Sequence, residues 1–271
     1  MTALPLAEVL DDCEHGGKAA QLGAALRAGL PVPPGFALAH AHVDAIVRDR
    51  APSVARYLTD ALAALGGPVA VRSSAVGEDG GSASFAGQHA TVLGVTCERT
   101  LLAAILKVRE SAHAPSAIAY RKRLGLHGAP RMGVVVQRLI DADKAGVLFT
   151  KNPMTGDDER VIEAAWGLGE VVVAGMVTPD RYRVARDGHV LERAAGDKDM
   201  AIRRSADGGT QEMAIDADRA AALCLDDVEL AALNHLAVRC EGHAPGPQDI
   251  EWAFEGARLY LLQRRAITRT A

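Results

Sequence analysis

Short apolar runs with strand character alternate with longer segments of helical periodicity along the 271 residues. Strands are predicted at 69–73, 90–95, 132–140, 145–150 and 161–165, helices at 18–28, 41–65, 100–124 and 216–240, and hairpins at 181–193 and 250–263. The alternation predicts an α/β or α+β fold. Because residues 125–131 are rich in turn formers, we expect two lobes, 1–130 and 131–271, with strand 132–140 paired to strand 145–150.

Composition excludes several classes of partner. The formal net charge is -4 and aromatic residues make up 4%, so neither a basic stripe nor stacking platforms for nucleic acid are expected. No apolar run reaches the roughly 20 residues of a membrane span, and the N-terminus lacks the pattern of a signal peptide. The four cysteines lie far apart in the sequence, which argues against a zinc site or a disulfide framework. We therefore expect a soluble cytoplasmic protein that binds neither nucleic acid nor membrane.

Two segments combine glycine with positive charge. Gly16-Gly17-Lys18 lets the backbone approach a ligand closely and supplies a mobile cation for phosphate, although a solvated lysine would show the same pattern. Arg72 ends the predicted strand 69–73 and precedes a loop rich in Gly, Ser and Ala that could fold over a polyphosphate. The alternative is a plain hairpin loop with an arginine in a structural ion pair.

A third segment combines carboxylates with an amide. Asp249 and Glu251 alternate along one predicted strand and therefore share a face, as do Gln263 and Arg265 on the next strand. Two carboxylates beside an amide oxygen form an oxygen-rich site suited to Mg²⁺. A surface hairpin with cross-strand ion pairs is the alternative that these residues leave open.

In order along the chain, these segments resemble the nucleotide-binding domain of phosphoenolpyruvate synthase and pyruvate phosphate dikinase. The resemblance is carried by GGKAAQLGAALRAGLPVPPGF at 16–36, VAVRSSAVGEDGGSASFAGQHATVLGV at 69–95, VVVQRLIDADKAGVLFTKNPMTGD at 134–157, EAAWGLGE at 163–170, VTPDRY at 177–182 and DIEWAFEGARLYLLQRR at 249–265. It implies an ATP-grasp fold, in which two lobes close on ATP.

The resemblance also implies roles for single residues. Lys18 and Arg72 would act on the phosphates, and Arg265 would steady the transferred group. Glu251 and Gln263 would hold Mg²⁺ with support from Asp249. A loop that covers the phosphates would correspond here to Ser84, Ala86 and Gly87. A linker strand whose backbone contacts adenine would correspond to Gln137, Arg138, Leu139 and Ile140.

The family moves the β-phosphoryl of ATP to a histidine on a swivelling domain, releasing AMP and phosphate. No histidine of this sequence lies in a matching Ser-His-Ala segment, and His89 and His113 do not qualify. We therefore expect the ATP-binding subunit of a split dikinase whose partner chain carries the histidine, with a phenolic or alcohol acceptor, or pyruvate. A self-contained small-molecule kinase, part of a rifampicin-type phosphotransferase and a non-catalytic nucleotide-binding subunit remain alternatives.

Overall fold

The computed structural model describes residues 3–49, 52–77, 89–123, 125 and 128–267. It divides into two compact units. Unit 1 comprises Met1–Arg27, Pro33–Leu139 and Ala206–Gly209, and unit 2 comprises Ala28–Val32, Ile140–Ser205 and Thr210–Ala271. The main change from unit 1 to unit 2 falls between Leu139 and Ile140, whereas the sequence led us to divide the lobes at residue 130.

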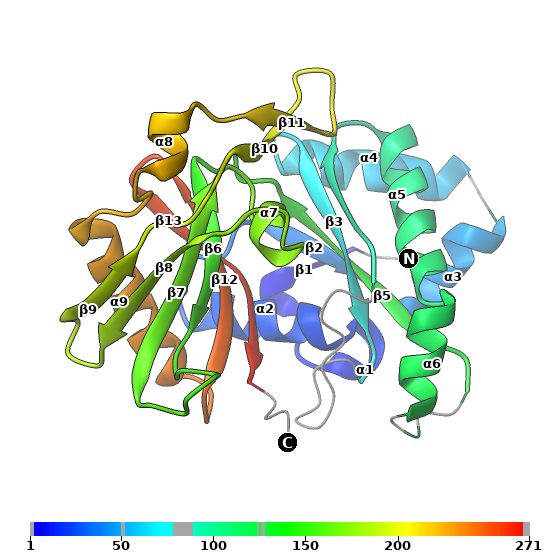
Figure 1. Cartoon of the computed structure of the whole chain (residues 1–271). Helices are drawn as coiled ribbons and strands as arrows, with labels where there is room; N and C mark the ends of the chain where they lie inside the picture. Colours follow the sequence, from blue (N-terminus) through cyan, green and yellow to red (C-terminus); the bar gives the residue numbers. More distant parts are fainter. Residues whose placement is uncertain (1–2, 50–51, 78–88, 124, 126–127, 268–271) are drawn as a thin grey trace. The chain divides into compact units, whose positions relative to one another are not determined.

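Unit 1 contains one antiparallel sheet of order β1-β2-β5-β3-β4 (Figure 1). Its strands are β1 (Leu4–Pro5), β2 (Gly35–Leu38), β3 (Val69–Ala75), β4 (Thr91–Val95) and β5 (Met132–Arg138). Its helices are α1 (Asp12–His15), α2 (Gly17–Arg27), α3 (His40–Asp49), α4 (Pro52–Ala64), α5 (Glu98–Ser111) and α6 (Pro115–Arg123), with a 3-10 turn at Leu6–Glu8.

The two faces of this sheet differ in chemistry. Val69, Val71 and Ala75 of β3 join one apolar core with Val134 and Val136 of β5 and with residues of α3, α4 and α5. Successive side chains of a strand point to opposite faces, so the residues of β3 between these apolar ones face the other way. That second face meets the start of α2.

Unit 2 contains a second antiparallel sheet, of order β13-β12-β6-β7-β8-β9, and a separate two-stranded ribbon, β10-β11. The strands are β6 (Lys144–Phe149), β7 (Glu159–Trp166), β8 (Asp180–Ala185), β9 (Val190–Ala194), β10 (Met200–Arg204), β11 (Thr210–Ala214), β12 (Gln248–Glu255) and β13 (Arg258–Ala266). The helices are α7 (Glu170–Val173), α8 (Ala217–Ala221) and α9 (Asp227–Glu241).

Alternation along β12 divides the six-stranded sheet into a buried apolar face and a more polar one. Ile250, Trp252 and Phe254 are at most 1% exposed. On the same face, side-chain nitrogens of Gln248 and Arg264 donate to the Cys240 carbonyl of α9, at 3.2 and 3.4 Å. Helix α9 therefore packs on this face, which leaves Asp249 and Glu251 on the opposite one.

Two sequence predictions were wrong. Strand 132–140 does not pair with 145–150, because β5 lies between β2 and β3 in unit 1 while β6 lies between β12 and β7 in unit 2. The helix predicted over 216–240 is two helices, α8 and α9, with a segment between them that bonds to β8.

Candidate functional site

The positive residues of unit 1 lie where the start of α2 meets β3. Lys18 occupies the first turn of α2 and is 9% exposed. Arg72 lies in β3, half-buried, with Val135 of β5 as its register partner. Ser74 shares the face of Arg72, and its Oγ accepts a hydrogen bond of 3.0 Å from the Ala19 amide. The structure thus brings these two predicted phosphate contacts onto adjoining elements.

Two glycines allow this close approach. Gly16 has φ +82°, and a Cβ on it would lie 1.9 Å from the carbonyl oxygen of Ser74. Gly133, the register partner of Ser74 on β5, would meet the His15 carbonyl oxygen at 2.4 Å if it carried a Cβ. Only residues without a side chain fit at such distances. The turn before α2 therefore lies directly on the backbone of the sheet.

The predicted adenine linker is bonded to the proline-rich segments of unit 1. The side-chain amide of Gln137 is buried and donates to the Pro33 carbonyl at 3.1 Å. The backbone amides of Arg138 and Leu139 donate to Pro34 and Pro68, each at 2.9 Å. These amides are therefore engaged within the protein, and the adenine contact expected of this segment stays a prediction.

The predicted metal residues of unit 2 lie on neighbouring strands in matching register. Asp249 of β12 is the partner of Arg265 of β13, and Glu251 is the partner of Gln263. Residues paired in this way have side chains on one face of the sheet. The register shifts between Glu251 and Trp252, so the matched pairs end there. The structure brings all four predicted residues of the hairpin together.

Asp249 has one carboxylate oxygen paired and one unpaired. Its Oδ2 accepts from Nε and Nη2 of Arg265 at 2.7 and 2.5 Å. Its Oδ1 is buried and has no hydrogen-bond partner among the described residues. Burial raises the pKa of this carboxyl, the guanidinium of Arg265 opposes the rise, and the charge of Glu251 adds to it. A buried, unpaired carboxylate oxygen is costly without a cation or water, so the donor set fits Mg²⁺.

Most of the chain matches a known protein family. The model of the pyruvate phosphate dikinase AMP/ATP-binding domain matches residues 50–271. The chain belongs to this family. Membership, together with the antiparallel α+β architecture of both units, confirms the predicted resemblance and the predicted fold class.

Curated relatives of this dikinase domain family are longer than the chain. A probable phosphoenolpyruvate synthase of Methanothermobacter thermautotrophicus is 35% identical over 93% of this chain and 44% of the relative. A rifampicin phosphotransferase of Bacillus subtilis is 38% identical over 73% of this chain and 23% of the relative. The chain therefore spans less than half the length of these relatives. A D-alanine–D-alanine ligase structure from Bacillus anthracis aligns with 92% of this chain and 55% of its own, at 10% identity and a TM-score of 0.41.

One part of the predicted dikinase-type site lies outside the described residues, namely the phosphate-covering loop with Ser84, Ala86 and Gly87. The first described residue after it is His89. Burial lowers the pKa of His89 to about 4, and the charge of Lys18 contributes to the shift. A neutral imidazole near an ammonium group avoids repulsion between two cations.

Sequence reasoning assigned no role to Glu163, which belongs to the polar face of the unit 2 sheet. Glu163 of β7 and Glu251 of β12 are both register partners of Val147 on β6, so they share a face across one strand. Burial raises the pKa of Glu163, and the charge of Asp249 adds to the rise. Its place in EAAWGLGE was the available signal, but strand order, which puts only β6 between Glu163 and Glu251, cannot be read from the residues around it.

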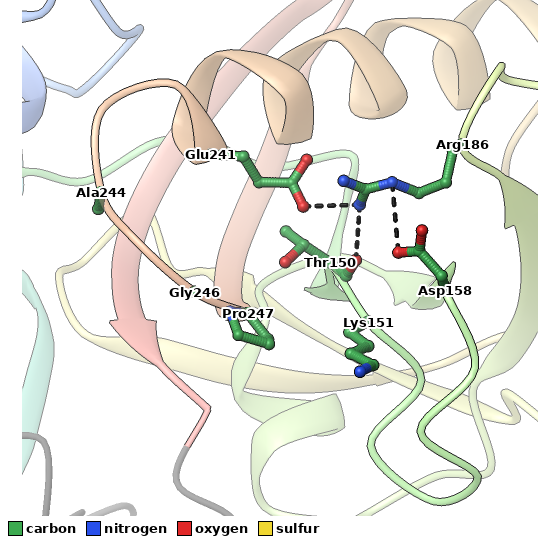
Figure 2. Close-up of a pocket in the computed structure, with 8 residues that line it drawn as sticks. All are labelled: Thr150, Lys151, Asp158, Arg186, Glu241, Ala244, Gly246 and Pro247. Carbon is green, nitrogen blue, oxygen red and sulfur yellow. Dashed lines mark hydrogen bonds and ion pairs between the residues drawn. The ribbon is translucent and has the colours of Figure 1, made fainter.

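A pocket of about 290 Å³ in unit 2 contains none of the predicted residues. Figure 2 shows it near the end of α9, with Arg186 reaching toward Glu241 and Asp158. Its lining residues are Thr150, Lys151, Asp158, Arg186, Glu241, Ala244, Gly246 and Pro247. Its two cations and two carboxylates balance, and Arg186 pairs with both acids and with the Thr150 carbonyl.

The described residues contain neither a cluster of three metal-binding side chains nor a membrane-spanning helix. No group of three or more His, Cys, Asp or Glu side chains in that part of the chain is arranged to hold a metal ion; the predicted set has two carboxylates and one amide. No helix in the described ranges combines the length and hydropathy that crossing a bilayer requires. The cytoplasmic location stays a prediction.

Proposed function

We propose that the chain is the ATP-binding component of a dikinase-type phosphotransferase. In the proposed reaction one ATP and one water give AMP, inorganic phosphate and a phosphohistidine, and the histidine belongs to a partner chain. The observation that carries the proposal is the register of β12 and β13, which pairs Asp249 with Arg265 and Glu251 with Gln263. These residues lie within the segment that matches the dikinase AMP/ATP-binding family.

Each predicted residue has a role that its chemistry supports. The ammonium of Lys18 and the guanidinium of Arg72 neutralise phosphate oxygens, and the fork of Arg265 binds the group in transfer. Glu251 and Gln263 would hold Mg²⁺, with Asp249 beside them, and the cation would supply positive charge to the phosphates when bound. Positioning and electrostatic stabilisation account for most of the acceleration in phosphoryl transfer.

The acceptor and the partner are the finer part of the proposal. The relatives named phosphoenolpyruvate synthase support pyruvate, and those named rifampicin phosphotransferase support an alcohol or phenol as the final acceptor. The greater length of these relatives supports a histidine domain and an acceptor domain beyond the ATP-binding part.

The first experiment tests Mg²⁺-dependent nucleotide binding. Calorimetric titration of the chain with a non-hydrolysable ATP analogue, with and without Mg²⁺, is compared for wild type, Glu251→Ala and Glu212→Ala. Glu212 is an exposed residue of β11 and serves as the matched control. We expect Glu251→Ala to lose at least about tenfold in Mg²⁺-dependent affinity, because one charged ligand of the cation is gone, and the control to bind like wild type. Equal affinity of all three proteins contradicts the metal assignment.

The second experiment identifies the products. The chain, ATP, Mg²⁺ and a histidine swivel domain taken from a curated relative are incubated, and nucleotides are separated by chromatography. AMP together with acid-labile phosphate on the histidine protein is the expected result. ADP formed without a second protein favours the self-contained kinase, and absence of turnover despite nucleotide binding favours the non-catalytic subunit. Either result overturns the dikinase mechanism proposed here.

A further inference from the structure

The residue before α2 cannot supply a side-chain cap to the helix. The residue before the helix is Gly16, which has no side chain to satisfy the free amides of the first turn. The cap comes instead from Ser74, 55 positions away from Ala19 along the chain, whose Oγ accepts the Ala19 amide at 3.0 Å. Ala19 is the third helical residue, and this amide is one that an N-cap side chain normally binds.

This hydrogen bond links the two elements that carry the positive residues. Ala19 directly follows Lys18 on α2, and Ser74 lies two positions after Arg72 on the same face of β3. Ser74 and Ala19 are both 0% exposed. The hydroxyl of Ser74 thus joins the backbone beside Lys18 to the strand that carries Arg72.

The glycine contacts restrict the turn before α2 in one direction, and the hydrogen bond of Ser74 restricts it in the others. Gly16 lies against the carbonyl of Ser74, and Gly133 lies against the carbonyl of His15, at distances that exclude a Cβ. These contacts stop the turn from moving toward the sheet, but van der Waals contacts do not prevent it from moving away or sliding along the strand. A directed hydrogen bond at Ala19 opposes both movements.

We propose that Ser74 is a positioning residue of the phosphate site, whose hydroxyl fixes Lys18 relative to Arg72 by capping α2. The proposal rests on the proposed function, because it assumes that Lys18 and Arg72 bind the phosphates of ATP. Ser74 is buried and acts through Lys18, without touching the nucleotide. If Ser74 served folding alone, its loss would weaken binding of every ligand of the site equally.

The test therefore compares a ligand that has phosphates with one that has none. Dissociation constants of the full chain for the Mg²⁺ complex of a non-hydrolysable ATP analogue and for adenosine are measured for wild type, Ser74→Ala and Ser73→Ala. Ser73 is 2% exposed and points to the opposite face of β3, so its variant is a matched control for a buried hydroxyl. Ser74→Thr keeps the hydroxyl, and Ser74→Cys keeps nearly the volume with a weak acceptor.

We expect Ser74→Ala to bind the ATP analogue about tenfold more weakly while its affinity for adenosine changes less than about twofold. Ser74→Thr restores the affinity for the analogue, and Ser73→Ala binds both ligands like wild type. Equal losses for both ligands in Ser74→Ala, or no loss, overturn the positioning role. If Ser74→Ala does not fold, the loss of affinity for the analogue relative to that for adenosine is measured in Ser74→Cys instead. Failure of wild type to bind the analogue overturns the proposed function instead, and the two failures are thereby distinguished.

Discussion

The buried pair of Asp180 and Lys198 gives a stability prediction that can be worked out from its contacts. Both side chains are 0% exposed. Asp180 accepts hydrogen bonds from Lys198, from the amides of Gly196 and Cys224 at 2.8 and 2.7 Å, and from the hydroxyl of Tyr182 at 3.3 Å. Lys198 has the Gly196 carbonyl as a further acceptor, at 3.3 Å. The carboxylate is thus better supplied with partners than the ammonium.

The two single substitutions should therefore differ in cost. Lys198→Met leaves the carboxylate buried but still bound by three donors, so we expect a loss near the low end for a broken buried pair, about 3 kcal/mol. Asp180→Ala leaves a buried ammonium with one carbonyl and removes the acceptor of three other donors, so we expect about 5 kcal/mol. The double variant should cost less than the sum of the singles by about 2 kcal/mol or more, because neither charge is then left alone.

Tryptophan fluorescence during urea unfolding is the appropriate assay. The chain has two tryptophans, and both Trp166 and Trp252 belong to unit 2, where the pair lies. The midpoint should fall in each single variant while the slope of the transition stays constant. Lys151→Met, which removes a partly exposed ammonium in the same unit, serves as the control and should change stability by less than about 0.5 kcal/mol. A loss below about 1 kcal/mol for Lys198→Met, or strict additivity in the double variant, refutes the reasoning.

Three further predictions concern the candidate site. Gly16→Ala should lower stability by about 3 kcal/mol, since φ is +82° and the added Cβ would meet the Ser74 carbonyl oxygen at 1.9 Å. Thermal unfolding is compared with that of the control Gly67→Ala, where a Cβ meets open space, and equal melting temperatures of the two variants would refute the prediction. Because the pKa of Asp249 is raised and only the carboxylate binds a cation, affinity for Mn²⁺ with the ATP analogue should fall as pH drops through that raised pKa. Arg265→Met should move this loss to higher pH in electron paramagnetic resonance titrations, and an unchanged profile would contradict the pairing. His89 should stay neutral down to about pH 4 in NMR titration. Since an unfolded histidine binds its proton near pH 6.5, the stability of the fold should fall as the pH drops from about 6.5 to about 4. Protonation of folded His89 at about pH 6 would contradict this prediction.

The common face of the predicted metal residues could be predicted from sequence, because it depends on strand periodicity. Asp249 and Glu251 alternate on one strand, Gln263 and Arg265 alternate on the next, and the short turn between them leaves few registers. For Lys18 and Arg72 the local signals, glycine before a helix and charge within a buried strand, left a solvated lysine and a structural ion pair open. Their phosphate roles were implied by the resemblance along the whole chain.

Contacts between distant segments explain the errors. The helical pattern at 216–240 is broken between α8 and α9 because the amides of Cys224 and Leu225 donate to Asp180 and Tyr182 of β8. The sequence also contains a local signal for the break, because Asp226 and Glu229 form a capping box at the start of α9. The predicted strand pairing was wrong for the same physical reason, because no residue within 132–140 indicates that its partners are 35–38 and 69–75.

The cap on α2 shows why a site can be predicted residue by residue while its rigidity cannot. Gly16, the residue before α2, has no side chain to cap the helix, so the segment Gly16-Gly17-Lys18 does not itself indicate how the first amides of α2 are satisfied. The hydroxyl that satisfies one of them belongs to a strand 55 positions away and comes into reach because Gly16 and Gly133 lack side chains. A lysine on a weakly capped helix would have to be ordered by the nucleotide, at a cost to affinity. The buried Ser74 bond orders the backbone beside Lys18 before any ligand arrives.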